Sequence, residues 1–182
     1  MNPEIIFSTG ACELGIVLVA RSERGVCAIL LGNDASELAR DLRRQFPQAI
    51  LRDAGSEIEP LVSQVAAFVA APALGLDVPL DVQGTAFQQR VWAALREIPA
   101  GSTESYIEVA RRIGAPQSAK EVGEACAANI LAVAIPCHRV VRKDGGLAGY
   151  RWGVKRKRAL LEREGVHART AELFEEAQCE CA

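Results

Sequence analysis

Long apolar runs and paired cysteines are both missing from this sequence. No apolar stretch approaches the roughly 18 residues that a membrane-spanning helix needs, and no basic region followed by an apolar segment opens the chain. We therefore expect a cytoplasmic protein without membrane contact. None of the six cysteines forms a C-x-x-C pair, so we predict no metal. A zinc site using Cys12, Cys27 or the pair Cys179/Cys181 is the alternative.

Composition and charge bound the class of protein. With 182 residues, 49% apolar and 5% aromatic, the chain can form one sizeable core or two small ones. The net charge of −2 hides an uneven distribution: −5 over residues 1–84, +7 over 85–170 and −4 over 171–182. Eight Lys or Arg residues between 139 and 158 face only Asp144, which suits a phosphate backbone. A solvated cationic face is the alternative.

The first half of the chain is predicted to be a small α/β unit. Apolar runs between short polar turns are typical of a strand meander, and apolar residues at helical spacing follow. The expected elements are strands at residues 5–7, 15–20 and 26–31 and helices at 34–46 and 58–70. No residue of this half indicates chemistry, so residues 1–80 are assigned to a supporting domain, joined onward through a Pro- and Gly-containing linker at 71–84.

The second half, residues 81–170, is predicted to be mostly helical. Three Ser/Thr residues are followed three positions later by Gln or Glu, the signature of a capping box at a helix start. These pairs are Thr85/Gln88, Ser105/Glu108 and Ser118/Glu121. The last two helices, joined through residues 114–117, form a helix-turn-helix pattern, for which plain helix packing is the alternative. A basic helix follows at 154–164, and 171–182 is an acidic tail, either a frayed helix or disordered.

The strongest chemical signal lies at Cys137. An apolar run at 131–135, of the kind that crosses a core, ends at Pro136, so the thiol is placed where buried chain meets a turn. A free thiol is only about 3% thiolate at pH 7 and needs a base or positive charge to become a nucleophile. The nearby residues that supply these are His138, Arg139, Arg142 and Lys143. An inert core thiol is the alternative.

Two longer strings extend this signal into a resemblance to a known family. Residues 135–141 read IPCHRVV, residues 149–153 read GYRWG, and Asn129 precedes them. Together they closely resemble the O6-alkylguanine-DNA alkyltransferases, above all the carboxy-terminal domain of the Ada adaptive-response type. The resemblance covers residues 4–166 and is strongest from Gly84 onward. It implies an α/β (α+β) fold, with a ribonuclease H-like amino-terminal domain and a helical DNA-binding domain.

The resemblance also implies a mechanism. Cys137 is the nucleophile that takes the alkyl group, and His138, oriented by Glu164, draws the thiol proton through a water. Asn129 pins the turn around the site, and Tyr106 donates to the departing guanine. For Asn129 a helix C-cap, and for Tyr106 core packing, are the alternatives.

Substrate and DNA contacts follow from the same resemblance. Backbone groups of Cys137 and Val140 read the exocyclic edge of the base, and Tyr150 and Arg151 lie on a loop that closes over it, with core packing the alternative for Tyr150. The full set predicted to bind DNA or substrate is Lys120, Cys126, Arg139, Val140, Tyr150, Arg151 and Lys157. The partner is double-stranded DNA containing O6-alkylguanine, approached from the minor groove by a monomer after the base is flipped out.

One part of the family pattern is altered here. Lys120 occupies the position of an Arg that fills the vacated base stack, and lysine lacks the planar group that stacks on bases. Glu121 and Glu124 share its helix, and Glu104 precedes Ser105. We therefore expect weaker and strongly salt-dependent duplex binding.

The expected reaction is a stoichiometric DNA repair transfer without cofactors. The thioether product is irreversible, each molecule acts once, and the alkylated protein is destabilised because an added methyl must fit a packed site. O4-alkylthymine is a second candidate lesion. Two other functions stay open: a non-catalytic, weakly DNA-binding module that recognises alkylated bases, and a cysteine hydrolase. Against the second, no oxyanion-hole glycine motif is evident.

Overall fold

The first half of the chain folds into one four-stranded sheet with two helices. The computed structural model describes residues 2–147 and 149–166. The elements of this half are β1 (Glu4–Cys12), β2 (Gly15–Ser22), β3 (Gly25–Gly32), α1 (Ala35–Gln45), β4 (Ile50–Asp53) and α2 (Glu59–Ala70). The three-strand meander and both helices are confirmed. The sequence pattern does not predict β4, because it is only four residues long and two of them are charged.

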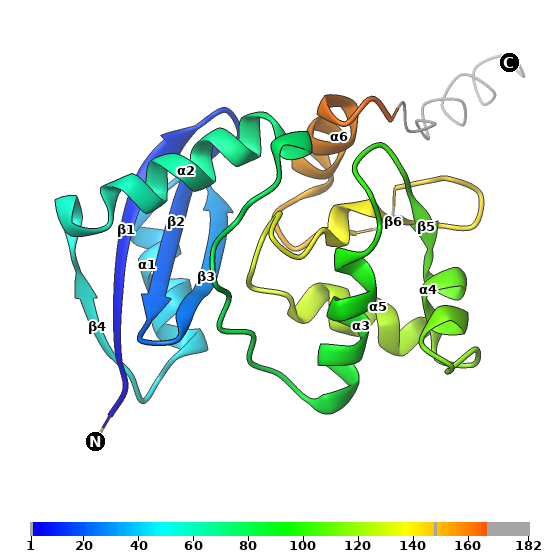
Figure 1. Cartoon of the computed structure of the whole chain (residues 1–182), viewed down its shortest axis with the longest axis horizontal. Helices are drawn as coiled ribbons and strands as arrows, with labels where there is room; N and C mark the ends of the chain where they lie inside the picture. Colours follow the sequence, from blue (N-terminus) through cyan, green and yellow to red (C-terminus); the bar gives the residue numbers. More distant parts are fainter. Residues whose placement is uncertain (1, 148, 167–182) are drawn as a thin grey trace, which may run out of the picture.

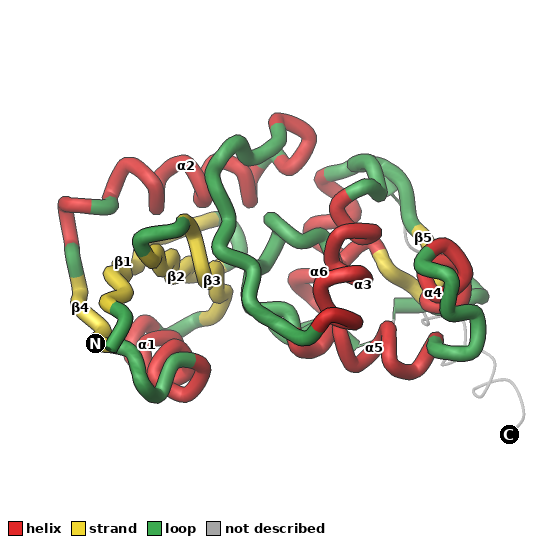
Figure 2. Tube along the Cα trace, turned by 60° about the horizontal axis from the view of Figure 1, so that its bottom comes forward, coloured by secondary structure: helices red, strands yellow, loops and turns green. Residues whose placement is uncertain are grey.

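The sheet has the order β3-β2-β1-β4 (Figure 1). Strands β1 to β3 are antiparallel, and β4 is parallel to β1. Helices α1 and α2 lie on opposite faces of this sheet (Figure 2). Helix α1 starts where the Asp34 carboxylate accepts a hydrogen bond from the Glu37 backbone amide, and it buries Leu38 and Leu42. Strand β3 is buried along nearly its whole length because it also faces the second half of the chain.

The predicted linker at 71–84 is attached to the sheet. Its backbone runs beside β3, where the Val26 amide donates to the Pro79 carbonyl and the Asp81 amide donates to the Val26 carbonyl, both at 2.8 Å. The buried Asp81 carboxylate also accepts a hydrogen bond from Ser22 and pairs with Arg24. These contacts fix the segment in place and set where the second half begins.

The second half is helical around two short parallel strands. Its elements are α3 (Ala86–Arg96), β5 (Glu104–Ser105), α4 (Tyr106–Arg112), α5 (Ala119–Ala128), β6 (Val140–Val141) and α6 (Val154–Arg163). Capping boxes at Thr85 and Ser105 are confirmed. The one predicted at Ser118 is wrong, because the backbone of Ser118 adopts a turn conformation (φ −101°, ψ 31°) and its side chain makes no capping hydrogen bond.

Buried side chains from both halves form one continuous hydrophobic cluster. Within the described residues, no helix is long and apolar enough to cross a membrane. The tail predicted at 171–182, with Cys179 and Cys181, lies outside those residues. No group of three metal-ligating side chains occurs in the part of the chain that is described, and its four cysteines, including Cys12 and Cys27, are free thiols.

Candidate active site

Asn129 builds the turn that carries the candidate nucleophile. Its side-chain Nδ2 donates to the Ile135 carbonyl at 3.0 Å and to the Cys137 sulfur at 3.2 Å, while its Oδ1 accepts from the Leu131 amide at 2.8 Å. The apolar run at 131–135 is therefore a tight turn, not a segment that crosses the core. Val133 takes a left-handed φ of 68° at its apex.

The sheet of the first half holds this turn from outside. The Ile29 amide on β3 donates to the Ile130 carbonyl at 2.8 Å, and the Ala132 amide donates back to Ile29 at 3.0 Å. Asn129, at the C-cap of α5, is only 1% exposed. The hinge role predicted for Asn129 agrees with this geometry, and its C-cap position does not compete with that role.

A buried relay of three charged or polar side chains lies next to Cys137. His138 Nε2 lies 2.8 Å from Glu164 Oε1, at the end of α6. Arg139 donates to both oxygens of Glu164, at 3.0 and 2.8 Å, and to the Ile98 carbonyl at 2.6 Å. The side chains of His138 and Glu164 are completely buried. Bidentate arginine pairing of this kind fixes the plane of the carboxylate.

Charge states in the relay follow from burial and pairing. Hydrogen bonds from His138 and Arg139 outweigh the effect of burial and lower the pKa of Glu164 to about 2. The carboxylate is therefore ionised and accepts a hydrogen bond from the Nε2–H group of His138. Burial lowers the pKa of His138, so its ring is neutral at pH 7. Its Nδ1 therefore carries a lone pair, and that atom is buried without a partner in the described ranges. Such a nitrogen is suited to act as a base through one water.

The positive charge around Cys137 differs in part from what the sequence predicts. Arg139 is neutralised by Glu164, while Arg142 and Lys143 are exposed. Lys157 on α6 is fully buried instead and donates to the Val140 carbonyl at 2.6 Å. Burial raises the pKa of the Cys137 thiol, and the nearby positive charges of Lys157 and Arg151 oppose that rise. Arg139 and Lys157, both predicted among the residues that bind DNA or substrate, are buried in the protein.

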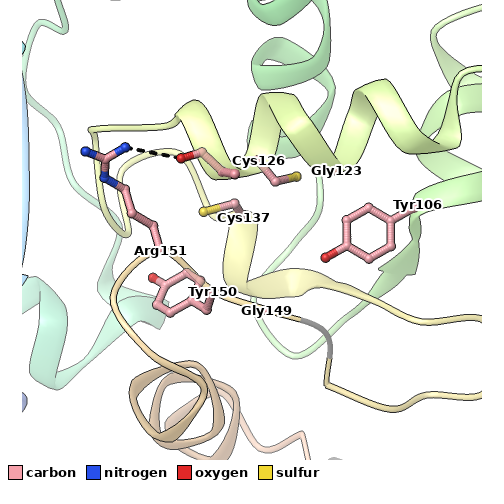
Figure 3. Close-up of a pocket in the computed structure, with 8 residues that line it drawn as sticks. Tyr106, Gly123, Cys126, Cys137, Gly149, Tyr150 and Arg151 are labelled. Carbon is pink, nitrogen blue, oxygen red and sulfur yellow. Dashed lines mark hydrogen bonds between the residues drawn. The ribbon is translucent and has the colours of Figure 1, made fainter.

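Cys137 opens into a cavity of about 340 Å³. Its lining residues are Tyr106, Gly123, Cys126, Ala127, Cys137, Gly149, Tyr150 and Arg151 (Figure 3). Five of the predicted site residues therefore meet around one space. The sequence pattern misses Gly123, Ala127 and Gly149, which are small and carry no chemical signal.

Both tyrosines in the cavity keep their protons. Burial raises the pKa of Tyr106 to about 12 and raises that of Tyr150. The Tyr150 hydroxyl is buried without a partner in the described residues. The Tyr150 ring packs edge-on against Trp152, with 5.3 Å between the ring centroids. Each hydroxyl can thus donate a hydrogen bond to a ligand in the cavity.

The outer surface of α5 carries the remaining predicted contact. Lys120 is 87% exposed and pairs with Glu124 at 3.8 Å, one turn along the helix. Glu104, also expected to weaken DNA binding, pairs with Arg112 at 3.2 Å. Exposed ion pairs of this kind are weak, about 0.2–1 kcal/mol, so Lys120 is available to another partner at little cost.

Labelling of Cys137 tests its protonation state. Burial raises the pKa of this thiol to about 11, against the lowering by Asn129 and Lys157. A raised thiol pKa leaves the sulfur protonated at neutral pH, so the labelling rate should rise about tenfold per pH unit from pH 7 to 10. Iodoacetamide labelling mapped by peptide mass measures this rate. A rate that levels off near pH 8 would contradict a raised pKa.

These features define a class of site: a buried cysteine with a Glu-His relay beside it, at the wall of a cavity. A family model described as "6-O-methylguanine DNA methyltransferase, DNA binding domain" matches residues 86–166. The bifunctional transcriptional activator/DNA repair enzyme Ada of Escherichia coli is 52% identical over 163 residues, covering 90% of this chain and 46% of that protein. The chain thus spans less than half the length of this relative.

Two further relatives are covered more completely. The inducible methylated-DNA–protein-cysteine methyltransferase of Bacillus subtilis is 38% identical over 128 residues, covering 70% of this chain and 72% of that protein. The crystal structure of Mycobacterium tuberculosis OGT in complex with DNA is 38% identical, with a TM-score of 0.73, covering 88% of this chain and 93% of the other. The chain belongs to the methylated-DNA–protein-cysteine methyltransferase family, which confirms the resemblance predicted from the sequence.

Proposed function

We propose that this chain repairs DNA by moving the alkyl group of O6-alkylguanine onto Cys137, once per molecule. The observation that carries the proposal is the placement of a buried thiol, at 3% exposure, between the Asn129 turn and the Glu164-His138 relay at the floor of a cavity. The named activities of the relatives described above support it, as does the DNA bound to the M. tuberculosis structure.

The transfer is an in-line displacement at the alkyl carbon. His138 Nδ1 takes the thiol proton through a water, and the sulfur then attacks the carbon. A carbon–sulfur bond forms as the carbon–oxygen bond breaks, and the electron pair of that bond stays on the guanine oxygen. Glu164 stabilises the protonated His138, as in a hydrolase triad. Asn129 and Lys157 stabilise the thiolate through a hydrogen bond and a nearby positive charge.

The departing guanine has hydrogen-bond donors around it. Tyr106 remains protonated and donates to the leaving base, while backbone groups of Cys137 and Val140 read its exocyclic edge. Tyr150 and Arg151 close the cavity. The product is a thioether in a packed site, so the alkylated protein is less stable than the free one. No residue here suggests a route to remove the alkyl group, and no cofactor takes part.

The proposed DNA contact is the α4–α5 pair, a helix-turn-helix that enters the minor groove. The target base leaves the duplex at a cost of a few kcal/mol, and Lys120 fills the gap. Lys120 lacks a stacking plane, and Glu121 and Glu124 add negative charge on the same helix. We therefore propose that duplex binding is weak and strongly salt-dependent.

The wider setting is proposed on the same basis. Residues 1–80 form a supporting domain and 81–170 the catalytic one, and a monomer acts on duplex DNA in the cytoplasm, where reducing conditions keep Cys137 a thiol. O4-alkylthymine in DNA is a second proposed substrate.

Intact-mass measurement with duplex DNA holding one O6-methylguanine tests the function. The protein should gain one methylene in mass, because the methyl replaces the thiol hydrogen, and digestion should map the gain to Cys137. Transfer from free O6-benzylguanine without transfer from duplex would place the defect in DNA binding at Lys120. If neither substrate gives transfer, the proposal is refuted. Labelling of Cys137 by a cysteine-hydrolase probe would then favour a hydrolase.

A further inference from the structure

An ion pair links the first half of the chain to the wall of the candidate active site. Arg151 Nη2 lies 3.3 Å from Asp41 Oδ2 on α1, although 110 residues separate the two in sequence. The same guanidinium donates from Nη1 to the Ala127 carbonyl at the end of α5, at 3.2 Å (Figure 3). Arg151 is therefore held at two points, one on each side of the cavity wall.

The segment that carries Arg151 has a glycine at each end. Gly149 begins it and is exposed, and Gly153 ends it with a φ of 95°, in the left-handed region that favours glycine. At its far end the segment is held by the buried Trp152 and by the Gly153 amide, which donates to the Tyr150 carbonyl at 2.9 Å. Its near end is held by the contacts of Arg151. Tyr150 lies between Gly149 and Arg151, so an anchor on Arg151 also sets where the Tyr150 ring stands.

Arg151 also separates two cavities. It lines the space around Cys137, and it lines a second cavity of about 460 Å³ beneath α1, whose walls include Asp41 and Trp152. If Arg151 moves away from Asp41, the partition between the two spaces moves with it. The shape of the cavity at Cys137 thus depends on a carboxylate from the first half of the chain.

The other contacts from α6 to the first half do not replace this anchor. Arg156 donates to the Leu14 carbonyl and to Asn33, and Arg163 pairs with Glu13. These bonds hold α6, which begins after Gly153. Arg156 also donates to the Trp152 carbonyl at 2.9 Å and so fixes the end of the 149–153 segment, which leaves Tyr150 and Arg151 as the part that Asp41 can position. Within this segment, Arg151 makes an ion pair with Asp41.

We propose that Asp41 is a positioning residue for the alkyl transfer. Its carboxylate holds Arg151 against the end of α5 and so keeps Tyr150 over the cavity, in the closed arrangement that aligns the base with Cys137. The proposal rests on the function proposed above. Asp41 touches neither the base nor the sulfur, so it acts through Arg151. The first half of the chain then affects the rate of the transfer as well as the stability of the fold.

Asp41→Asn tests this role, because it keeps the size of the side chain and removes its charge. Both partners are partly exposed, with 22% and 33% of their side chains accessible, so we expect the variant to fold. The single-turnover rate at saturating O6-methylguanine duplex should fall about three- to tenfold, since small misplacements of reacting groups have large effects on rate. The duplex concentration for half-maximal rate should change less than about twofold.

Two further variants serve as controls. Asp41→Glu restores the charge and should recover at least half of the lost rate, an outcome not expected from general loosening of α1. Glu37→Gln removes one negative charge from the same helix, one turn earlier, and Glu37 pairs with Arg40 instead of Arg151. We expect the wild-type rate from Glu37→Gln. Iodoacetamide should label Cys137 faster in Asp41→Asn than in the wild type, with thermal midpoints compared for all four proteins.

The outcomes separate the two proposals. Wild-type protein that transfers no methyl group refutes the proposed function, whatever the variants do. Active wild type with an unchanged rate in Asp41→Asn overturns the positioning role. An equal loss in Glu37→Gln, a loss confined to duplex affinity, or no recovery in Asp41→Glu would also overturn it.

Discussion

Replacing Cys137 by alanine is expected to abolish methyl transfer, with no mass gain from duplex or free-base substrate. The reason is chemical: the sulfur forms the new bond to the alkyl carbon, and Cys126, which lines the same cavity, has its pKa raised strongly by burial. The loss should be at least about 10⁴-fold, because an alanine cannot form the covalent product. Intact mass after prolonged incubation measures it.

The Cys137→Ala protein should still fold and bind DNA. Asn129 keeps its bonds to the Ile135 carbonyl and the Leu131 amide, so the turn is held without the sulfur. We expect a stability loss of about 1 kcal/mol for the small cavity left behind. Cys12→Ser is the matched control, since Cys12 is a free thiol on β1. Methyl transfer by Cys137→Ala would show that another residue accepts the group.

Replacing Glu164 by glutamine is expected to slow transfer about 100-fold and to destabilise the protein by about 3 kcal/mol. The first effect arises because a neutral amide no longer stabilises the protonated His138. The second arises because Arg139 loses a bidentate partner inside the protein and stays charged. Single-turnover rates and urea unfolding measure the two effects separately. Glu162→Gln, an exposed site on α6, is the control and should match the wild type.

The same variant should change how stability depends on pH. The folded-state pKa of Glu164 is lowered to about 2 from 4.5, so its stabilising effect is present above pH 4.5 and is lost as the pH falls toward 2. The stability difference between wild type and Glu164→Gln should therefore shrink across this range. A variant that unfolds more easily but reacts at the wild-type rate would exclude Glu164 from the relay while keeping it in the fold.

Local patterns in the sequence predict much of this molecule. The strand meander, the caps at Thr85 and Ser105 and the helices around them depend on neighbours within a few residues, and all of these are confirmed. The cap at Ser118 fails because the Ser118 amide closes a turn on the Ala115 carbonyl and its backbone lies outside the extended conformation that a cap needs. Pattern alone does not report that backbone conformation.

The sequence by itself determined the family and pointed to Cys137 and His138 as the candidate nucleophile and base, because these lie in one short string whose chemistry is local. Only the tertiary structure decided which charges surround them. It buries Arg139 on Glu164, brings Lys157 under Val140, and pairs Arg151 with Asp41 from the other half of the chain. Such pairings depend on how distant elements pack and on which side chains lose water, and no spacing within a sequence records either one.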